Sequence, residues 1–272
     1  MMPPTERKTD HLVNWFYSSE MDFNSFGNAP RGSYMLATIP RSGSTLCAIR
    51  FWQTGLLGAP LEYLNFKAIG GLLQRLGYLP RRDGFIPAPQ ISDYWFDVQR
   101  LRTSTNGVFG FKMFIANYVA LAHRAPEFLE EISPNYVVYL TRRDVIGQAI
   151  SYSRAQRSNA WFAGIPNVPD VDYDYEHIKL CLRSIGYQKT AWERAFALSG
   201  VSPMRITYED LLLPCSKVVE DVLCFMGIRP DAQCIKPIPM IEPQTDSKSL
   251  EWRGRFDDDS RHDIDMIAHR AK

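Results

Sequence analysis

Cysteine is scarce in this sequence, and no two cysteines stand at the Cys-x-x-Cys spacing. The five cysteines are Cys47, Cys181, Cys215, Cys224 and Cys234. An odd number without close pairs argues against a disulfide framework and against a zinc site. We therefore expect reduced, mostly buried thiols, which suit a protein of the reducing cytoplasm.

Long apolar runs and an excess of one charge are also missing. No apolar stretch reaches the 18 residues that a membrane-spanning helix needs. The first residues, MMPPTERKTDHLVNW, contain no apolar segment of the kind found in signal peptides. The net charge is only +1, whereas nucleic-acid readers are strongly basic. We expect neither a membrane span nor a nucleic-acid partner.

The stretch SYMLATIPRSGSTLCAIRFWQTGLLG, residues 33–58, resembles a phosphate-binding loop but lacks the lysine expected of a nucleotide-triphosphate site. An apolar run at 33–39 predicts a buried strand, and the apolar spacing over 43–56 predicts a helix capped by Ser42 or Ser44. A small polar loop between strand and helix is an anion-binding arrangement, because N–H groups converge there. A capped helix start without a ligand is the structural alternative.

The loop contains several groups that suit a phosphate or a sulfate. Gly43 lets the backbone come close to an anion, and Arg41 brings a planar guanidinium. Hydroxyl donors follow at Ser42, Ser44 and Thr45. The Walker pattern needs a lysine and an earlier glycine, and both are absent. This disfavours an ATPase or GTPase, although a kinase or nucleotide hydrolase stays as the alternative function.

Strands and helices alternate along the rest of the chain, which predicts a parallel α/β sheet. Further strands are predicted at 107–114, 135–144 and 203–214, and further helices at 144–158, 173–199 and 215–228. We interpret 1–31 as an N-terminal extension and 32–272 as the domain. Ligands bind at the carboxyl ends of parallel strands. The loops after Ile39, Phe111, Leu140 and Ile206 should therefore surround one site.

A second basic motif, YLTRRDVIGQAIS, follows the strand at 135–144. Arg142 and Arg143 stand at the strand end, and Ser151 lies two turns into the next helix, on one face with its start. One arginine and this serine can hold a single phosphate, and the spacing permits either arginine. A surface basic pair with a solvated serine is the alternative.

Taken together, these motifs resemble the sulfotransferases that use 3′-phosphoadenosine 5′-phosphosulfate (PAPS), most closely the bacterial trehalose 2-sulfotransferase and lipopolysaccharide sulfotransferase type. The resemblance rests on RSGSTL, TGLLGAPLEYL, VFGFK, TRRDVIGQAISYSRA, RITYEDLLLP and EWRGRF, and covers roughly residues 33–260. It implies a P-loop NTPase-like, three-layer fold with a central parallel sheet flanked by helices. It also implies that 41–45 bind the phosphosulfate, that a downstream arginine and serine bind the 3′-phosphate, and that no metal is needed.

The resemblance also implies a catalytic base. Many sulfotransferases use a histidine after the second strand, where this chain has GFKMF. The trehalose-sulfating type uses a glutamate in a Pro-x-Glu stretch, which Pro60-Leu61-Glu62 matches. We expect Glu62 to accept the proton of the acceptor hydroxyl and Arg41 to stabilise the charge that develops on the leaving group.

Four more residues are predicted for the site. Lys112, at the end of the second strand, is expected beside the transferred group or the acceptor sugar. Trp161 offers a face for sugar stacking or else belongs to the core. Arg253 and Arg255 are expected to close over the nucleotide phosphates.

The expected acceptor is a carbohydrate hydroxyl on trehalose, a glycolipid or lipopolysaccharide. Segments 66–106 and 155–175 are interpreted as loops that select it. Relatives of the resembled type form dimers, so a homodimer is a further expectation. A scaffold that keeps the fold without catalysis is the remaining alternative.

Overall fold

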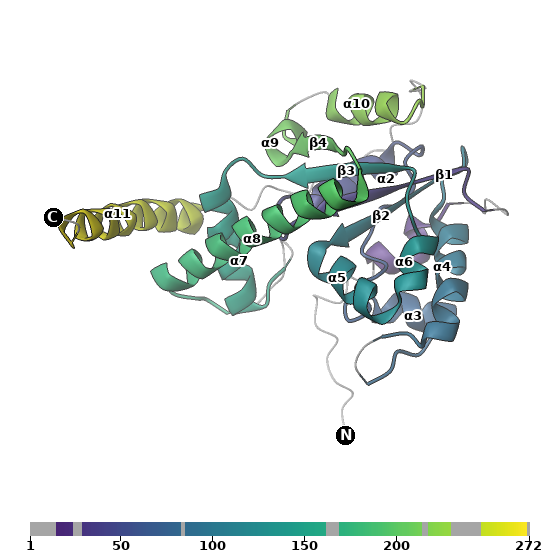
Figure 1. The fold of residues 1–272 in the computed structure, drawn as a ribbon, viewed down its shortest axis with the longest axis horizontal. Coiled ribbons are helices and arrows are strands. Elements are labelled where there is room, and N and C mark those ends of the chain that lie inside the picture. The colour runs from purple at the N-terminus through teal and green to yellow at the C-terminus, as the bar shows by residue number, and fades with distance from the viewer. Residues whose placement is uncertain are drawn as a thin grey trace.

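A computed structural model describes residues 15–23, 29–82, 85–161, 169–213, 217–229 and 246–270. Four parallel strands form the sheet in the order β2-β1-β3-β4 (Figure 1). The elements are η1 (Ser19–Met21), β1 (Gly32–Thr38), α2 (Ser44–Gln53), α3 (Gly70–Leu76), α4 (Ala88–Arg102), β2 (Val108–Phe114), α5 (Ile115–Arg124), α6 (Pro126–Glu131), β3 (Tyr136–Thr141), α7 (Val145–Ser158), α8 (Tyr175–Ser199), β4 (Met204–Thr207), α9 (Tyr208–Leu211), α10 (Lys217–Phe225) and α11 (Ser247–Arg270). The predicted α/β class with a parallel sheet is confirmed.

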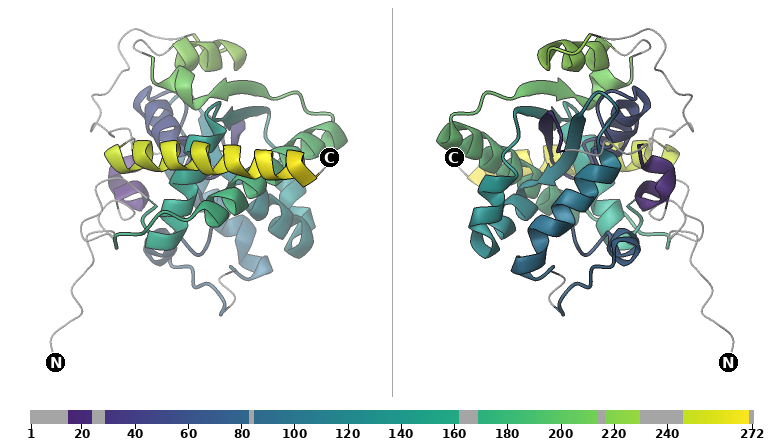
Figure 2. Two further views of the ribbon diagram at one scale, coloured as in Figure 1. Left: turned by 90° about the vertical axis from the view of Figure 1, so that its left-hand side faces the viewer. Right: turned by 90° about the vertical axis from the view of Figure 1, so that its right-hand side faces the viewer.

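Helices cover both faces of the sheet, as the two side views in Figure 2 show. Successive side chains of a strand point to opposite faces. Tyr34 and Leu36 of β1 pack with α2, α9 and α10, whereas Met35 and Ala37 pack in the larger cluster with α5, α6 and α8. Both faces of β1 are therefore buried, which explains its continuous apolar run.

The predicted strand over 203–214 is wrong in its second half. β4 ends at Thr207, and the next four residues form α9. Thr207 is the N-cap of α9, where its side chain accepts a hydrogen bond from the Asp210 N–H, and Glu209 and Asp210 occupy the first turn. A threonine cap followed by acidic residues is a helix-start signal that prevails over the apolar content of this stretch.

The segment 66–106, predicted as acceptor loops, contains two helices, α3 and α4. Buried Leu72 and Leu73 attach α3 to the core, and buried Tyr94, Trp95 and Val98 do the same for α4. Apolar residues three and four apart are the pattern of a helix that faces the core. This segment is therefore part of the scaffold. Residues 162–168 of the other predicted loop lie outside the described residues.

Residues 15–23 of the predicted extension pack on the domain. Phe16, Tyr17, Met21 and Phe23 are all buried. The fully buried Arg102 donates hydrogen bonds to the carbonyls of Phe16 and Ser18, and its Nε lies 3.1 Å from Asp22 Oδ1. A buried guanidinium needs such partners, so the end of α4 holds this segment in place. Residues 1–14 and 24–28 lie outside the described residues.

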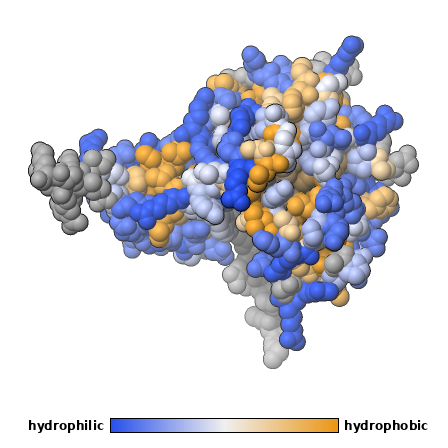
Figure 3. Space-filling model, viewed as in Figure 1, coloured by the Kyte–Doolittle hydropathy of each residue, from blue (hydrophilic) through white to orange (hydrophobic). Residues whose placement is uncertain are grey.

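The C-terminal helix α11 lies against α7 and extends away from the body of the molecule (Figure 1). Trp252 and Phe256 are buried where it docks. Apolar and polar residues are interspersed over the face shown in Figure 3. Over the described ranges, none of the helices combines the length and apolarity needed to cross a bilayer.

Candidate active site

The loop between β1 and α2 has an unusual backbone. Arg41 has a φ of 64°, and Gly43 has a φ of 81° as the N-cap of α2. A left-handed arginine costs about 1–3 kcal/mol, which the surroundings must offset. A Cβ added to Gly43 would lie 2.2 Å from the Tyr208 ring. Only glycine therefore fits between this ring and the loop.

Among the described residues, no side chain caps the N-terminus of α2. The predicted caps are wrong, because the Ser42 hydroxyl, fully buried, lies 2.7 Å from Thr38 Oγ1 and Ser44 is already the first helical residue. Ser42 N–H donates to the Ile39 carbonyl, so Ser42 shapes the loop from within. The first N–H groups of a helix have no partner inside it. This end of α2 is therefore a place where an anion is stabilised.

The loop is tied to helices on the other side of the sheet. Gln148 of α7 donates to the Pro40 carbonyl at 2.8 Å, and the Trp192 indole of α8 donates to the Thr38 carbonyl at 2.9 Å. Both side chains are completely buried. These long-range bonds stabilise the strained backbone at Arg41.

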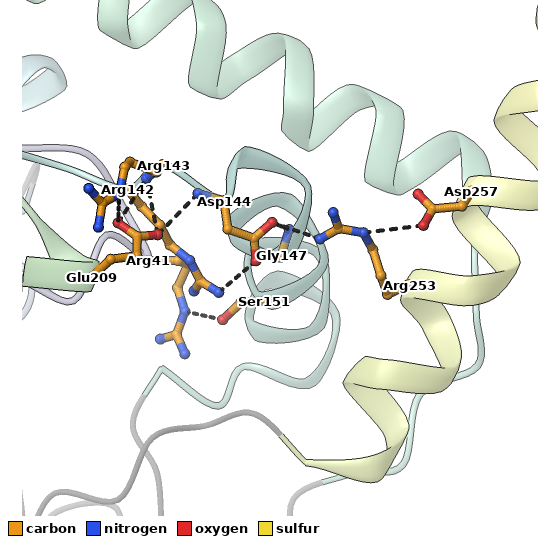
Figure 4. A network of polar contacts seen from close by, with 9 residues as sticks. All are labelled: Arg41, Arg142, Arg143, Asp144, Gly147, Ser151, Glu209, Arg253 and Asp257. Atoms are coloured by element: carbon orange, nitrogen blue, oxygen red, sulfur yellow. Dashed lines mark hydrogen bonds and ion pairs between the residues drawn. The ribbon is translucent and has the colours of Figure 1, made fainter. Parts of the chain in front are cut away.

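Three arginines gather at the loop. Arg41 Nε donates to Ser151 Oγ at 2.9 Å (Figure 4). Arg41 Nη1 also donates to the Trp161 carbonyl. Burial, followed by the positive charges of Arg142 and Arg154, lowers the pKa of Arg41 to about 10. Arg41 is still charged at neutral pH, so the cluster favours an anion that relieves the repulsion.

The two arginines after β3 have different surroundings. Arg142 Cζ lies 5.0 Å from the centre of the Tyr208 ring, and its buried Nε has no hydrogen-bond partner among the described residues. Arg143, with 63% of its side chain exposed, forms ion pairs with Glu209 and Asp210. The spacing left the choice open, and the fold turns Arg142 toward the loop and Arg143 toward the acidic pair.

Two carboxylates occupy the start of α7 (Figure 4). Asp144 caps the helix by accepting from the Gly147 N–H at 3.0 Å, and it pairs with Arg142 at 3.3 Å and with Arg253 at 2.7 Å. Glu209 accepts from the N–H groups of Arg143 and Asp144. Burial raises the pKa of both acids. The hydrogen bonds and the nearby arginines lower it by more, so both pKa values lie below the ordinary range.

Glu62 and Lys112 form an ion pair beside the loop. Glu62 Oε1 lies 2.8 Å from Lys112 Nζ, and Glu62 Oε2 accepts from the Asn65 amide at 2.9 Å. Lys112 Nζ also lies 3.5 Å from Ser44 Oγ, at the first residue of α2. Burial raises the pKa of Glu62, yet the charge and hydrogen bond of Lys112, with the Asn65 amide, bring it below its ordinary value. Glu62 is therefore ionised at neutral pH.

The remaining predicted residues are farther from this centre or differently engaged. Trp161 is 39% exposed, so it does not belong to the core. Arg253 reaches the cap of α7 through Asp144. Arg255 pairs with Glu251 and lies over the Tyr173 ring, so it is not brought to the loop.

Sequence reasoning missed several residues that shape the site. They are Asn65, Asp144, Arg154, Tyr208 and Glu209. An aspartate three residues before a glycine at a helix start is a cap signal that identifies Asp144. Asn65 lies only three residues from its partner Glu62. Arg154, Tyr208 and Glu209 belong to the motifs that carry the resemblance, but their partners lie in distant segments, so no role was predicted for them.

A family model described as Stf0 sulphotransferase matches residues 33–259. The match begins at β1, includes the loop and both strand ends described above, and continues into α11. The chain therefore belongs to this family and is a sulfotransferase, as the motifs predicted.

Two curated relatives of this chain are trehalose 2-sulfotransferases. The trehalose 2-sulfotransferase of Mycolicibacterium smegmatis is 26% identical over 268 residues, which cover 85% of this chain and 96% of that protein. The trehalose 2-sulfotransferase of Mycobacterium tuberculosis is 27% identical over 254 residues, covering 82% of this chain and 93% of the relative. Both matches extend over nearly the whole length of the relatives, which confirms the predicted resemblance to the trehalose type.

Proposed function

We propose that this sulfotransferase moves a sulfuryl group from PAPS to a carbohydrate hydroxyl, with trehalose as the first acceptor to test. The observation that carries the proposal is an ionised carboxylate, Glu62, placed with Lys112 beside the uncapped start of α2. A base next to an anion site is what transfer from an anionic donor to a hydroxyl requires. The strand order and the loop after β1 support a P-loop NTPase-like fold.

The donor would lie across the ends of β1 and β3. Arg41, Gly43, Ser44 and Thr45 are proposed to hold the phosphosulfate, with Ser42 shaping the loop. Arg142 and Ser151 are proposed for the 3′-phosphate, with Arg143 at the rim. The partnerless Nε of Arg142 supports this assignment, because a buried N–H without a partner costs about 1–3 kcal/mol.

Glu62 accepts the proton of the acceptor hydroxyl while that oxygen attacks sulfur in line. Arg41 and the N–H groups of the loop stabilise the charge that develops on the departing phosphate oxygen. Lys112 lies on the side of the transferred group, and the exposed Trp161 offers a face to the sugar. Arg253 of α11, which already reaches Asp144, is proposed to approach the nucleotide phosphates from outside.

Replacing Glu62 by glutamine tests this mechanism. Glu62→Gln should abolish transfer of labelled sulfate to trehalose, since the amide accepts no proton, while adenosine 3′,5′-bisphosphate still binds. Glu20→Gln is a matched control on an exposed glutamate of the N-terminal segment and should keep full activity. Normal turnover by Glu62→Gln would place the base elsewhere.

The donor is tested separately by thermal shift. Adenosine 3′,5′-bisphosphate should raise the melting temperature, because a ligand that binds only the folded state stabilises it. A shift with ATP and Mg²⁺ alone would instead favour the kinase alternative. A panel of trehalose, glycolipid and lipopolysaccharide acceptors then identifies the sugar.

A further inference from the structure

The Lys112 side chain is placed between two parts of the site. Its Nζ lies 2.8 Å from Glu62 Oε1 on one side and 3.5 Å from Ser44 Oγ on the other. Only 2% of the side chain is exposed. The ammonium therefore faces the carboxylate and the start of α2 at the same time, away from bulk water.

The backbone at Lys112 is fixed. Lys112 lies within β2 opposite Leu36 of β1, and its N–H donates to the Leu61 carbonyl at 2.8 Å. The same bond places Leu61, and hence Glu62, next to the strand. Only rotations within the lysine side chain are left to move the ammonium, and the step from Glu62 to Ser44 needs no backbone change.

An anion at the start of α2 would compete with Glu62 for this ammonium. A hydrogen bond from the Ser44 hydroxyl places an anion oxygen about 2.7 Å away. That oxygen is then within reach of Nζ. The three N–H groups of the ammonium can reach both anions, but its single positive charge is then divided between them, so Glu62 loses part of the stabilisation that Lys112 gives it.

We propose that Lys112 is a positioning residue that makes the basicity of Glu62 depend on whether the donor is bound. The inference rests on the proposed function and deepens it. Without donor, Lys112 pairs with Glu62 and keeps it a weak base. With donor, the ammonium also pairs with the sulfonate beside Ser44, and Glu62 becomes a stronger base as the acceptor arrives.

The proton and charge balance of the transfer step follows directly. A bond forms between the acceptor oxygen and sulfur, and the bond between sulfur and the bridging phosphate oxygen breaks. The hydroxyl proton goes to Glu62, and the electron pair of the broken bond stays on the phosphate. Lys112 keeps its protons throughout and remains beside the transferred sulfuryl group.

The groups around Glu62 come from three segments. Lys112 comes from β2, Asn65 from the segment of Glu62 itself, and Tyr17 from the N-terminal segment. Burial, with a contribution from Glu62, raises the pKa of Tyr17 well above its ordinary value, so Tyr17 stays neutral. The charge that donor binding can withdraw from Glu62 is therefore that of Lys112.

Proton uptake on binding PAPS tests the coupling. Calorimetry near pH 5 in two buffers of different ionisation enthalpy measures the protons taken up, and subtracting the result for Glu62→Gln removes the donor's own titration. The wild type should take up a fraction of a proton more than Glu62→Gln, because a stronger base binds more protons at this pH. Equal uptake by two proteins that both bind PAPS would overturn the inference.

Lys112 variants separate this role from a structural one. Lys112→Met should shrink the Glu62-dependent uptake, and Lys112→Arg, which keeps the charge, should restore part of it. In the pH profile of Lys112→Met, the acid limb of kcat/KM for the donor, which reports Glu62 in the free enzyme, should move to higher pH, whereas the acid limb of kcat for trehalose at saturating donor should move less. Lys67→Met, at an exposed lysine near Glu62 in sequence, is the matched control.

The outcomes distinguish the two proposals. No binding of PAPS or adenosine 3′,5′-bisphosphate by the wild type would sink the proposed function. Normal binding and turnover with the same Glu62-dependent uptake in Lys112→Met would sink the role of Lys112 alone. If Lys112→Met does not fold, Lys112→Gln, which removes the charge but keeps a polar side chain, replaces it in the same measurements.

Discussion

Two strand-to-helix connections at the same edge of the sheet have the same local architecture, but the N-termini of their helices are capped differently. Each runs from a strand through a short loop into a helix, one from β1 to α2 and the other from β3 to α7. The first helix begins at Gly43 without a side-chain cap, whereas the second begins at Asp144, whose carboxylate caps it. Glu209 also takes the N–H groups before α7. We call the start of α2 the open start, because no carboxylate of the described residues caps it, and the start of α7 the closed start, because Asp144 and Glu209 occupy it.

This contrast indicates where a ligand anion belongs. A helix start attracts negative charge whether it comes from the chain or from a ligand. Carboxylates of the chain satisfy the start of α7, and the arginines there are partly neutralised by Asp144. The start of α2 has a neighbouring arginine and hydroxyls instead.

Removing the guanidinium from the open start should have the largest effect. Arg41→Ala should weaken binding of adenosine 3′,5′-bisphosphate by about 100-fold, because losing a buried charged partner costs roughly 3 kcal/mol. Isothermal titration calorimetry measures this. Arg143→Ala, at the exposed arginine of the closed start, should change affinity less than about threefold. Equal losses of affinity in the two variants would show that the start of α2 is no more important for donor binding than the start of α7.

Adding a methyl group at each helix start should destabilise the open one more. Gly43→Ala forces a side chain into a left-handed residue and against the Tyr208 ring, at a cost of about 2–4 kcal/mol. Gly147→Ala meets the Asp144 carboxylate instead, which rotates away at the cost of a cap, about 1 kcal/mol. Urea unfolding measures both. A larger loss for Gly147→Ala would contradict this order.

Neutralising the cap of α7 should strengthen donor binding. Asp144→Asn keeps a cap oxygen for the Gly147 N–H but removes the charge that pairs with Arg142. Adenosine 3′,5′-bisphosphate should then bind about three- to tenfold more tightly, as expected from one nearby charge at moderate screening. Asp257→Asn, which also faces Arg253, is the control and should leave affinity unchanged. Weaker binding by Asp144→Asn would show that Asp144 supports the donor.

The smallest effect concerns acid stability. Because the pKa of Glu209 is lower in the folded chain than in the unfolded one, its stabilisation is complete above the ordinary glutamate pKa and is lost as the pH falls through the lowered value. Glu209→Gln should therefore have a lower melting temperature than wild type at neutral pH, by a few degrees, and the gap should close below about pH 4. Thermal scans from pH 7 to pH 3 measure this. A constant gap would indicate another origin.

The strand, loop and helix around Gly43 were predictable from local patterns, but the missing side-chain cap of α2 and the Glu209 contacts before α7 were not. A continuous apolar run, a glycine and small polar residues indicate strand, loop and helix within one stretch of chain around Gly43. Nothing near Arg143 announces Glu209, because the two are 66 residues apart and meet only when β4 pairs with β3. The same holds for Lys112, whose partner Glu62 belongs to another segment.

The order of apolar and polar residues was enough to predict a parallel α/β fold with a small polar loop after its first strand, because strand burial and helix starts depend on neighbours in the chain. Which arginine turns to the loop, which carboxylates close the start of α7 and how Lys112 lies between Glu62 and Ser44 depended on packing across the sheet. Those contacts join residues that crossover connections bring to one edge, and their distances follow from strand register and burial rather than from spacing in the sequence.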